Sequence, residues 1–474
     1  MQKDSERIPY SYRQKGDLTT GPIQSHLIRM TIPMIWGLLA VISVQLADTY
    51  FIALLGDTDI LAGISFTFPV TMLISHMVFG INIALSSVTA RLIGEKKTDD
   101  MRRVVLHGLM LAFTAAGTIA LVTYIFLKPL FFMMGADDNT FPVILDYMPL
   151  WLAASLVLAL PVNSNSAMRA NGDTTMPAII MCSIAAINFV LDPILIFGLF
   201  GFPALGVTGA ALATFIAYLC GTFLALYILI VRKNLIATDG LHLDKFKDSM
   251  KRLLVIAIPA GIANVINPAA SVVAVAILAA YGPEAVAAFG VASRVEAFAL
   301  LVAIAIALGM APIIGQNWGA GFYKRVRETI DHAIVWNLVW SACVALFLAI
   351  AATPIASLFS DDPAVIHYTV LFFWIVPISY GIGNLVFGWS AAFNAIGRPQ
   401  IAFVMIFVKS FIITIPALFI GGWLYDAHGV FIALCISNIV SGLLFHIFSS
   451  RYCEQRAHEN EEMLHTDDAN AKTV

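Results

Sequence analysis

The chain has 474 residues, of which 59% are hydrophobic and 12% are charged, with a formal net charge of −3. An ordinary soluble domain carries about 25% charged residues, so this composition excludes a soluble globular enzyme and favours a polytopic membrane protein. The slightly negative charge gives no reason to expect a nucleic-acid partner. The five cysteines lack metal-ligand spacing, so we expect no disulfide framework, no zinc site and no cofactor.

Twelve apolar runs are long enough to cross a bilayer as helices, which takes about 20 residues each. The polar first 25 residues do not resemble a cleavable signal peptide. We therefore predict an all-α membrane protein with twelve spans. The runs cover residues 27–55, 60–90, 104–134, 142–168, 175–200, 206–231, 252–281, 285–318, 329–357, 365–395, 400–423 and 429–450.

The basic residues support this number of spans. With the N-terminus in the cytoplasm, 24 of the 27 Lys and Arg fall in cytoplasmic segments, as the positive-inside rule requires. Lys128 lies on the outer side, and Arg294 and Lys409 lie within spans. We expect a multi-pass protein of the cell membrane (the inner membrane in a cell with two), with both termini cytoplasmic.

The two halves of the sequence repeat one design. A shift of 226 residues places Pro33 on Pro259 and Gly56 on Gly282. Each half has six spans, an even number, so the two repeats are parallel, a plan typical of transporters. The predicted domains are a cytoplasmic tail (1–25), a first lobe (26–231), a cytoplasmic linker (232–251), a second lobe (252–450) and a C-terminal tail (451–474).

Charged residues inside predicted spans are costly and usually functional. Asp48 and Asp192 both lie deep within spans of the first half, the first and the fifth. Their repeat partners are uncharged: Ala274 for Asp48, and Ala417 or Ile415 for Asp192. The repeated scaffold therefore does not need the two acids. They point to a role that belongs to the first half alone.

Each acid has a polar neighbour on its own helix face, Gln45 for Asp48 and Asn188 for Asp192. Thr214 adds a hydroxyl in the sixth span. A buried carboxyl group without a counter-charge favours its neutral form, so the pair could carry a proton, and its oxygens could also hold Na⁺. The alternative is that the acids bond neighbouring amides and only fix helix packing.

Further residues of the first half suggest a substrate cavity and a hinge. Asn163 and Asn165 supply amides, and Met34 and Met168 could line an adaptable apolar pocket. Pro33 should kink the first span. That kink is either a static feature or a hinge that responds to protonation of the acid on the same helix.

Three charged residues lie deep within spans of the second half. Arg294 and Glu296 are two residues apart near the outer end of one span, which suggests a local ion pair or side chains that reach the interface. Lys409 either pairs with Glu296 or faces a central cavity, and the sequence leaves both readings open.

Several motifs together resemble the multidrug and toxic compound extrusion (MATE) family over residues 20–450. They are IPMIWG, LADTYFIALLG, TARLIGEKK, MRANGDTTMP, NFVLDPILIFG, GVTGAALAT and GQNWGAGFYKRV. The resemblance implies two six-helix bundles around a central cleft that opens alternately to either side. It also implies export of cationic, amphipathic compounds in exchange for H⁺ or Na⁺, without an enzymatic activity.

One branch of the family has an acid on its first helix and an Asn-x-x-x-Asp pair on its fifth. These positions match Asp48, Asn188 and Asp192, and a family threonine on the sixth helix matches Thr214. The resemblance thus assigns cation coupling to these residues. The same four side chains would be the ligands if the cation is Na⁺.

Another branch uses a glutamate on the seventh helix and an aspartate on the tenth, where this sequence has Asn267 and Gly383. The chain therefore resembles the DinF-type branch, which favours H⁺ coupling. We predict a monomeric, proton-coupled exporter of amphipathic, often cationic drugs, embedded in membrane lipid. The alternatives are Na⁺-coupled efflux, or a flippase for lipids or polysaccharide precursors from the same superfamily.

Overall fold

A computed structural model describes residues 16–56, 58–237, 243–266 and 268–471, and over these residues the chain is helical without strands. Asn267 and the basic residues predicted in the first 15 positions lie outside this range. Eleven helical segments of the described chain are long and apolar enough to cross a membrane. The last of them, Pro399–Gln455, leaves helical geometry at Tyr425 and Asp426 and so holds both of the last two predicted spans. The all-α membrane architecture is confirmed.

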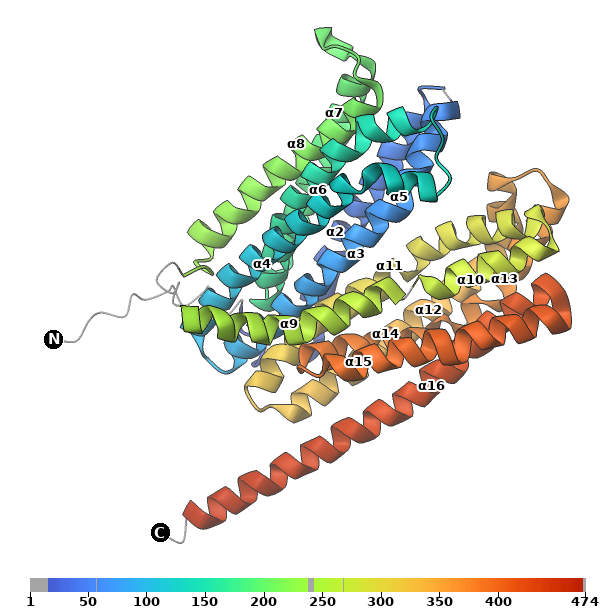
Figure 1. The fold of residues 1–474 in the computed structure, drawn as a ribbon. Helices are drawn as coiled ribbons and strands as arrows, with labels where there is room; N and C mark the ends of the chain where they lie inside the picture. The colour runs from blue at the N-terminus through green and yellow to red at the C-terminus, as the bar shows by residue number, and fades with distance from the viewer. Residues whose placement is uncertain (1–15, 57, 238–242, 267, 472–474) are drawn as a thin grey trace. The chain divides into compact units, whose positions relative to one another are not determined.

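The helices divide into two units, residues 1–20 with 28–265 and residues 21–27 with 266–474. In the first unit α8 packs against both α6 and α7, and α3 packs against α4 and α6 (Figure 1). The helices of this unit are α2 (Ile23–Ala53), α3 (Thr58–Gly94), α4 (Thr98–Ile125), α5 (Leu127–Met133), α6 (Phe141–Ala170), α7 (Thr175–Phe197), η1 (Leu199–Gly201), α8 (Gly206–Tyr227), the π-helical η2 (Ile228–Arg232) and α9 (Leu243–Ile266).

Alanine and larger aliphatic side chains fill the core of this unit, and small residues are usual where membrane helices approach closely. Gly209 of α8 shows how close the approach is. A Cβ atom there would lie 2.5 Å from the carbonyl oxygen of Leu195 in α7, so this crossing has room for hydrogen alone. The backbone of α8 is thereby held directly against the backbone of α7 at Leu195, three residues after Asp192.

In the second unit α11 packs on α12, α13 and α14, and α14 packs on α15 and α16. Its core contains phenylalanines of α11, α13 and α16. The elements are α10 (Ala269–Leu278), η3 (Ala279–Tyr281), α11 (Pro283–Gly319), α12 (Tyr323–Phe359), α13 (Pro363–Ile375), η4 (Pro377–Ser379), α14 (Tyr380–Ala395), α15 (Pro399–Phe407), the π-helical η5 (Val408–Thr414) and α16 (Ile415–Ala471).

Candidate functional site

A polar cluster lies inside the first unit, where α7 meets α8. Asn188 and Asp192 are one turn apart on α7, and both side chains are fully buried. The Asn188 amide Nδ2 donates to Asp192 Oδ1 at 3.3 Å and to Thr214 Oγ1 of α8 at 3.2 Å. One amide therefore ties the carboxyl group of α7 to the hydroxyl group of α8.

Asp48 of α2 completes the cluster. Its carboxyl group interacts with the side chains of Asp192, Asn188 and Thr214, although 144 residues separate the two acids in the chain. Two carboxylates that share a site repel each other when both are ionised. An arrangement of this kind is relieved by a bound cation, the smallest of which is a proton.

Three oxygen atoms of the cluster have unused acceptor capacity. Asp48 Oδ1, Asn188 Oδ1 and Asp192 Oδ2 are buried and accept no hydrogen bond from the part of the chain that is described. A buried acceptor without a donor is expensive and usually marks an ion, a water molecule or a reactive group. The described residues contain no group of three His, Cys, Asp or Glu placed to hold a metal ion. The free oxygens thus suit a monovalent cation or a proton.

Two tyrosines that the sequence analysis did not single out lie near the acids. Tyr147 of α6 is close enough to interact electrostatically with Asp48 and Asp192, and Tyr218 of α8 interacts with Asp48. Tyr218 follows Thr214 by one helical turn, so its position could have been inferred from spacing. Tyr147 comes from a helix whose sequence holds no such signal.

The remaining predicted residues of the first half are placed as follows. Gln45 is exposed. Its backbone carbonyl accepts a hydrogen bond from the Thr49 hydroxyl at 2.8 Å. Pro33 lies inside an unbroken α2. Its role as a hinge stays a prediction.

The predicted cavity residues Asn163, Asn165, Met34 and Met168 are all buried. Asn163 Nδ2 donates to a carbonyl of its own helix at 2.8 Å, while Oδ1 of both asparagines has no donor within the described residues. Met168 belongs to the apolar core of the unit. The side chains are packed inside the unit in this structure, and the cavity stays a prediction.

In the second unit, Glu296 of α11 and Lys409 of η5 lie close enough to attract each other. The two groups form no ion pair within 4.0 Å among the described residues, so the role of Lys409 stays a prediction. Arg294 is exposed. The acid pair of the first unit therefore differs from the charges of the second unit, where an acid has a basic neighbour.

Apolar helices long enough to cross a membrane, in two halves that repeat one design, with a carboxyl pair inside one of them, are typical of a transporter rather than an enzyme. The chain belongs to the MatE family, whose model matches residues 33–194 and again residues 259–420. The two matches are offset by 226 residues, the shift found between the halves of the sequence.

Relatives and solved structures agree with this assignment. The chain is 35% identical to a protein of Shewanella oneidensis named FAD transporter, over 93% of this chain and 98% of that one. It is 28% identical to the multidrug export protein MepA of Staphylococcus haemolyticus, over 90% and 93%. A crystal structure of a mutant of the Vibrio cholerae MATE transporter VcmN matches with a TM-score of 0.87 at 30% identity, over 94% and 98%. The predicted family and the absence of an enzymatic role are confirmed, whereas the DinF-type branch stays a prediction.

Proposed function

We propose that this chain is a proton-coupled antiporter that exports amphipathic small molecules, with Asp48 and Asp192 as its coupling carboxyl groups. The observation that carries the proposal is the convergence of the two acids on one amide and one hydroxyl, with three buried oxygens left without donors. Protonation removes the repulsion between the acids, and loss of the proton restores it. The free energy of the site therefore changes with the proton gradient.

The position of Asn188 favours H⁺ over Na⁺ as the coupling ion. Its amide Nδ2 donates hydrogen bonds to Asp192 Oδ1 and Thr214 Oγ1. Both oxygens are among the ligands that a Na⁺ ion would need. A proton needs one carboxyl oxygen and leaves these bonds in place. Na⁺ held by Asp48, Asn188, Asp192 and Thr214 is the alternative, because the unused oxygens of Asp48, Asn188 and Asp192 could also be ligands.

Protonation can reach the rest of the unit through α2. Asp48 lies on this helix fifteen residues after Pro33, where one backbone hydrogen bond is missing. A solved structure of the Vibrio cholerae transporter VcmN is described as its bent form. We propose that Pro33 is the hinge at which α2 bends when the charge on Asp48 changes.

Purified protein in proteoliposomes, with a pH gradient and a Na⁺ gradient imposed in separate experiments, tests the proposal. Asp48→Asn and Asp192→Asn should each reduce dye transport driven by the pH gradient at least about 10-fold, and the double variant should be no worse than either single one, because the acids act as a unit. Asp146→Asn, which removes an exposed acid of α6, is the matched control. Undiminished transport by either single variant contradicts the assignment, and transport driven by Na⁺ alone replaces H⁺ with Na⁺.

A flavin dinucleotide is the second candidate cargo. The relative named FAD transporter is 35% identical to this chain, against 28% or less for the relatives named multidrug export protein. Counter-transport of FAD and of a cationic dye in the same proteoliposomes separates the two cargoes. Transport of a labelled lipid in place of both would favour the flippase alternative.

We also propose that the protein works as a monomer in lipid with both termini in the cytoplasm. The count of basic residues on predicted cytoplasmic segments supports the orientation. Protease protection of tags at both ends of the chain in sealed vesicles tests it. Light scattering of the purified protein tests the oligomeric state.

A further inference from the structure

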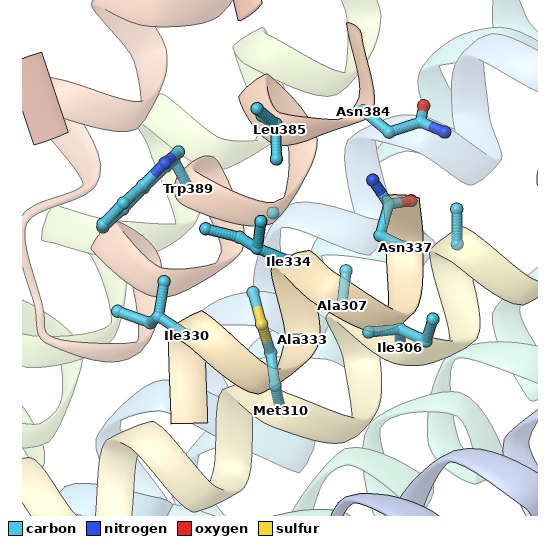
Figure 2. Close-up of a pocket in the computed structure, with 12 residues that line it drawn as sticks. Ile306, Ala307, Met310, Ile330, Ala333, Ile334, Asn337, Asn384, Leu385 and Trp389 are labelled. Carbon is cyan, nitrogen blue, oxygen red and sulfur yellow. The ribbon is translucent and has the colours of Figure 1, made fainter. Parts of the chain in front are cut away.

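A narrow pocket lies within the second unit, between α11, α12 and α14. Figure 2 shows apolar side chains along its walls, among them Met310 of α11, Ile334 of α12 and Leu385 of α14. The empty space measures about 360 Å³, which includes open solvent at the mouth, and the centre of a water-sized molecule can occupy about 30 Å³ of it. The pocket is therefore narrow, with room for a few water molecules or for the edge of a flat molecule.

Two asparagines are the polar part of this lining, and Figure 2 shows them at the same end of the pocket. Asn337 of α12 is 7% exposed, and its Nδ2 donates to the carbonyl oxygen of Gly381 at 3.0 Å. That bond fixes the orientation of the amide. Its Oδ1 is left buried with no donor in the described chain.

Asn384 of α14 offers the complementary group. Its Nδ2 is buried and finds no acceptor among the described residues. The pocket therefore presents one unused acceptor, from Asn337, and one unused donor. Unused groups of this kind are costly inside a membrane protein unless a ligand or water bonds them.

The lining also restricts the charge of a ligand. None of the described side chains that line the pocket is charged, so neither a cationic amine nor a phosphate would find a counter-charge there.

The ring of Trp389 closes the end of the pocket opposite the two asparagines. Its indole N–H donates to His446 Nδ1 at 3.2 Å, which fixes the ring as a flat wall. The neighbouring thioether of Met310 is flexible and can adjust to a ligand.

We propose that this pocket is a subsite for the edge of a neutral, planar ring that carries an N–H group beside a C=O group. A cyclic imide has this edge: its N–H group donates to Asn337 Oδ1 while its carbonyl accepts from Asn384 Nδ2. The pyrimidinedione ring of a flavin is such an imide. The inference rests on the proposed export function and names the part of a flavin cargo that the second unit recognises.

Equilibrium binding to the full chain in detergent or nanodiscs tests the subsite without an ion gradient. Riboflavin is the probe, compared with an analogue methylated at the imide nitrogen, which cannot donate to Asn337. The wild-type chain should bind riboflavin about 3- to 10-fold more tightly than the analogue, as expected for one hydrogen bond. In Asn337→Leu the ratio of the two affinities should fall to about 1, and Asn384→Leu should weaken both ligands to a similar degree.

Controls separate recognition from loss of folding. Asn264→Leu removes an amide of α9 that bonds a carbonyl of its own helix at 2.8 Å, and it should leave the affinity ratio unchanged. Gly388→Leu fills the pocket and keeps both amides. A Cβ atom at this glycine would lie 3.8 Å from Met310, so the helix tolerates a side chain there, and riboflavin binding should be lost.

An equal affinity of the wild-type chain for riboflavin and the methylated analogue overturns the proposal. So does a wild-type ratio in Asn337→Leu, or full riboflavin binding by Gly388→Leu. These outcomes are distinct from failure of the coupling site. If dye export driven by the pH gradient persists without flavin binding, the ring subsite alone is wrong. If the riboflavin preference holds while Asp48→Asn and Asp192→Asn still transport, coupling alone is wrong.

Discussion

Replacement of Asn82 by leucine should strongly destabilise the first unit. Asn82 of α3 is buried and bridges two positions of α6. Its Nδ2 donates to the carbonyl oxygen of Val162 at 2.7 Å, and its Oδ1 accepts from Arg169 Nη2 at 2.9 Å. Arg169 is 7% exposed, so its guanidinium depends on protein acceptors rather than on water.

The cost follows from these two bonds. The neutral bond contributes about 1 kcal/mol and the bond to the charged group about 1.5–3 kcal/mol. Loss of the acceptor also leaves a buried guanidinium N–H unpaired, which brings the expected loss to about 3–5 kcal/mol. Removing both partners in Asn82→Leu with Arg169→Met should cost clearly less than the sum of the single changes, because no unpaired charge remains.

Unfolding of the purified protein by increasing SDS in mixed micelles, followed by circular dichroism, measures these differences in unfolding free energy. Asn264→Leu is the control, because that amide bonds within its own helix and its loss should cost about 1 kcal/mol or less. A loss below about 1 kcal/mol for Asn82→Leu, or strict additivity in the double variant, would show that the bridge between α3 and α6 does not hold the unit together.

Three further changes probe other parts of the chain. Gly209→Val should force α7 and α8 apart, because its Cβ would meet the Leu195 carbonyl at 2.5 Å; both the melting temperature and transport driven by the pH gradient should fall. Thr214→Val keeps the shape of the side chain but removes an acceptor for an amide N–H, so it should lower the melting temperature slightly and change the pH profile of transport. The Thr140 hydroxyl, with two backbone N–H groups, lowers the pKa of Asp137 below 3.8. That stabilisation is complete above the unfolded pKa and is lost as the pH falls through the folded one. Asp137→Asn should therefore melt earlier than the wild type at pH 7, and this difference should disappear as the pH falls through the folded pKa of Asp137.

Periodicity and composition were sufficient to predict the helices and the internal repeat, because both are local or repeated properties of the chain. The predicted domain boundaries stay a prediction, and the structure groups α9 up to residue 265 with the first unit. The Asn188–Asp192 contact was predictable for the same reason, since four residues span about one helical turn. Spacing was less reliable for Gln45. Three residues rotate a helix by about 300°, which places this side chain about 60° away from Asp48. The structure leaves it exposed.

Contacts between distant segments could not be derived from spacing. Tyr147 lies near the acid pair because α6 packs against α8, and no periodic pattern in α6 marks that residue. The two amides of the pocket in the second unit, Asn337 and Asn384, come from separate helices and have no shared motif. Thr214 was singled out as a hydroxyl of the sixth span and then matched to a family threonine, but spacing could not show that it contacts Asn188. Tertiary packing decides which polar residues meet, and a single sequence contains no direct record of it.

Ala274 of α10 occupies the position that Asp48 has in α2, and it is fully buried without a carboxyl group. One copy of the duplicated scaffold is thus free of the acid that the other copy keeps. Mutations that reshape the neutral copy for a new molecule leave the surroundings of the acid pair untouched. With the roles proposed for the two units, such a division would let cargo preference drift over evolutionary time while coupling at the acid pair is preserved. It offers a physical reason why relatives named for a dinucleotide and for drugs share one architecture.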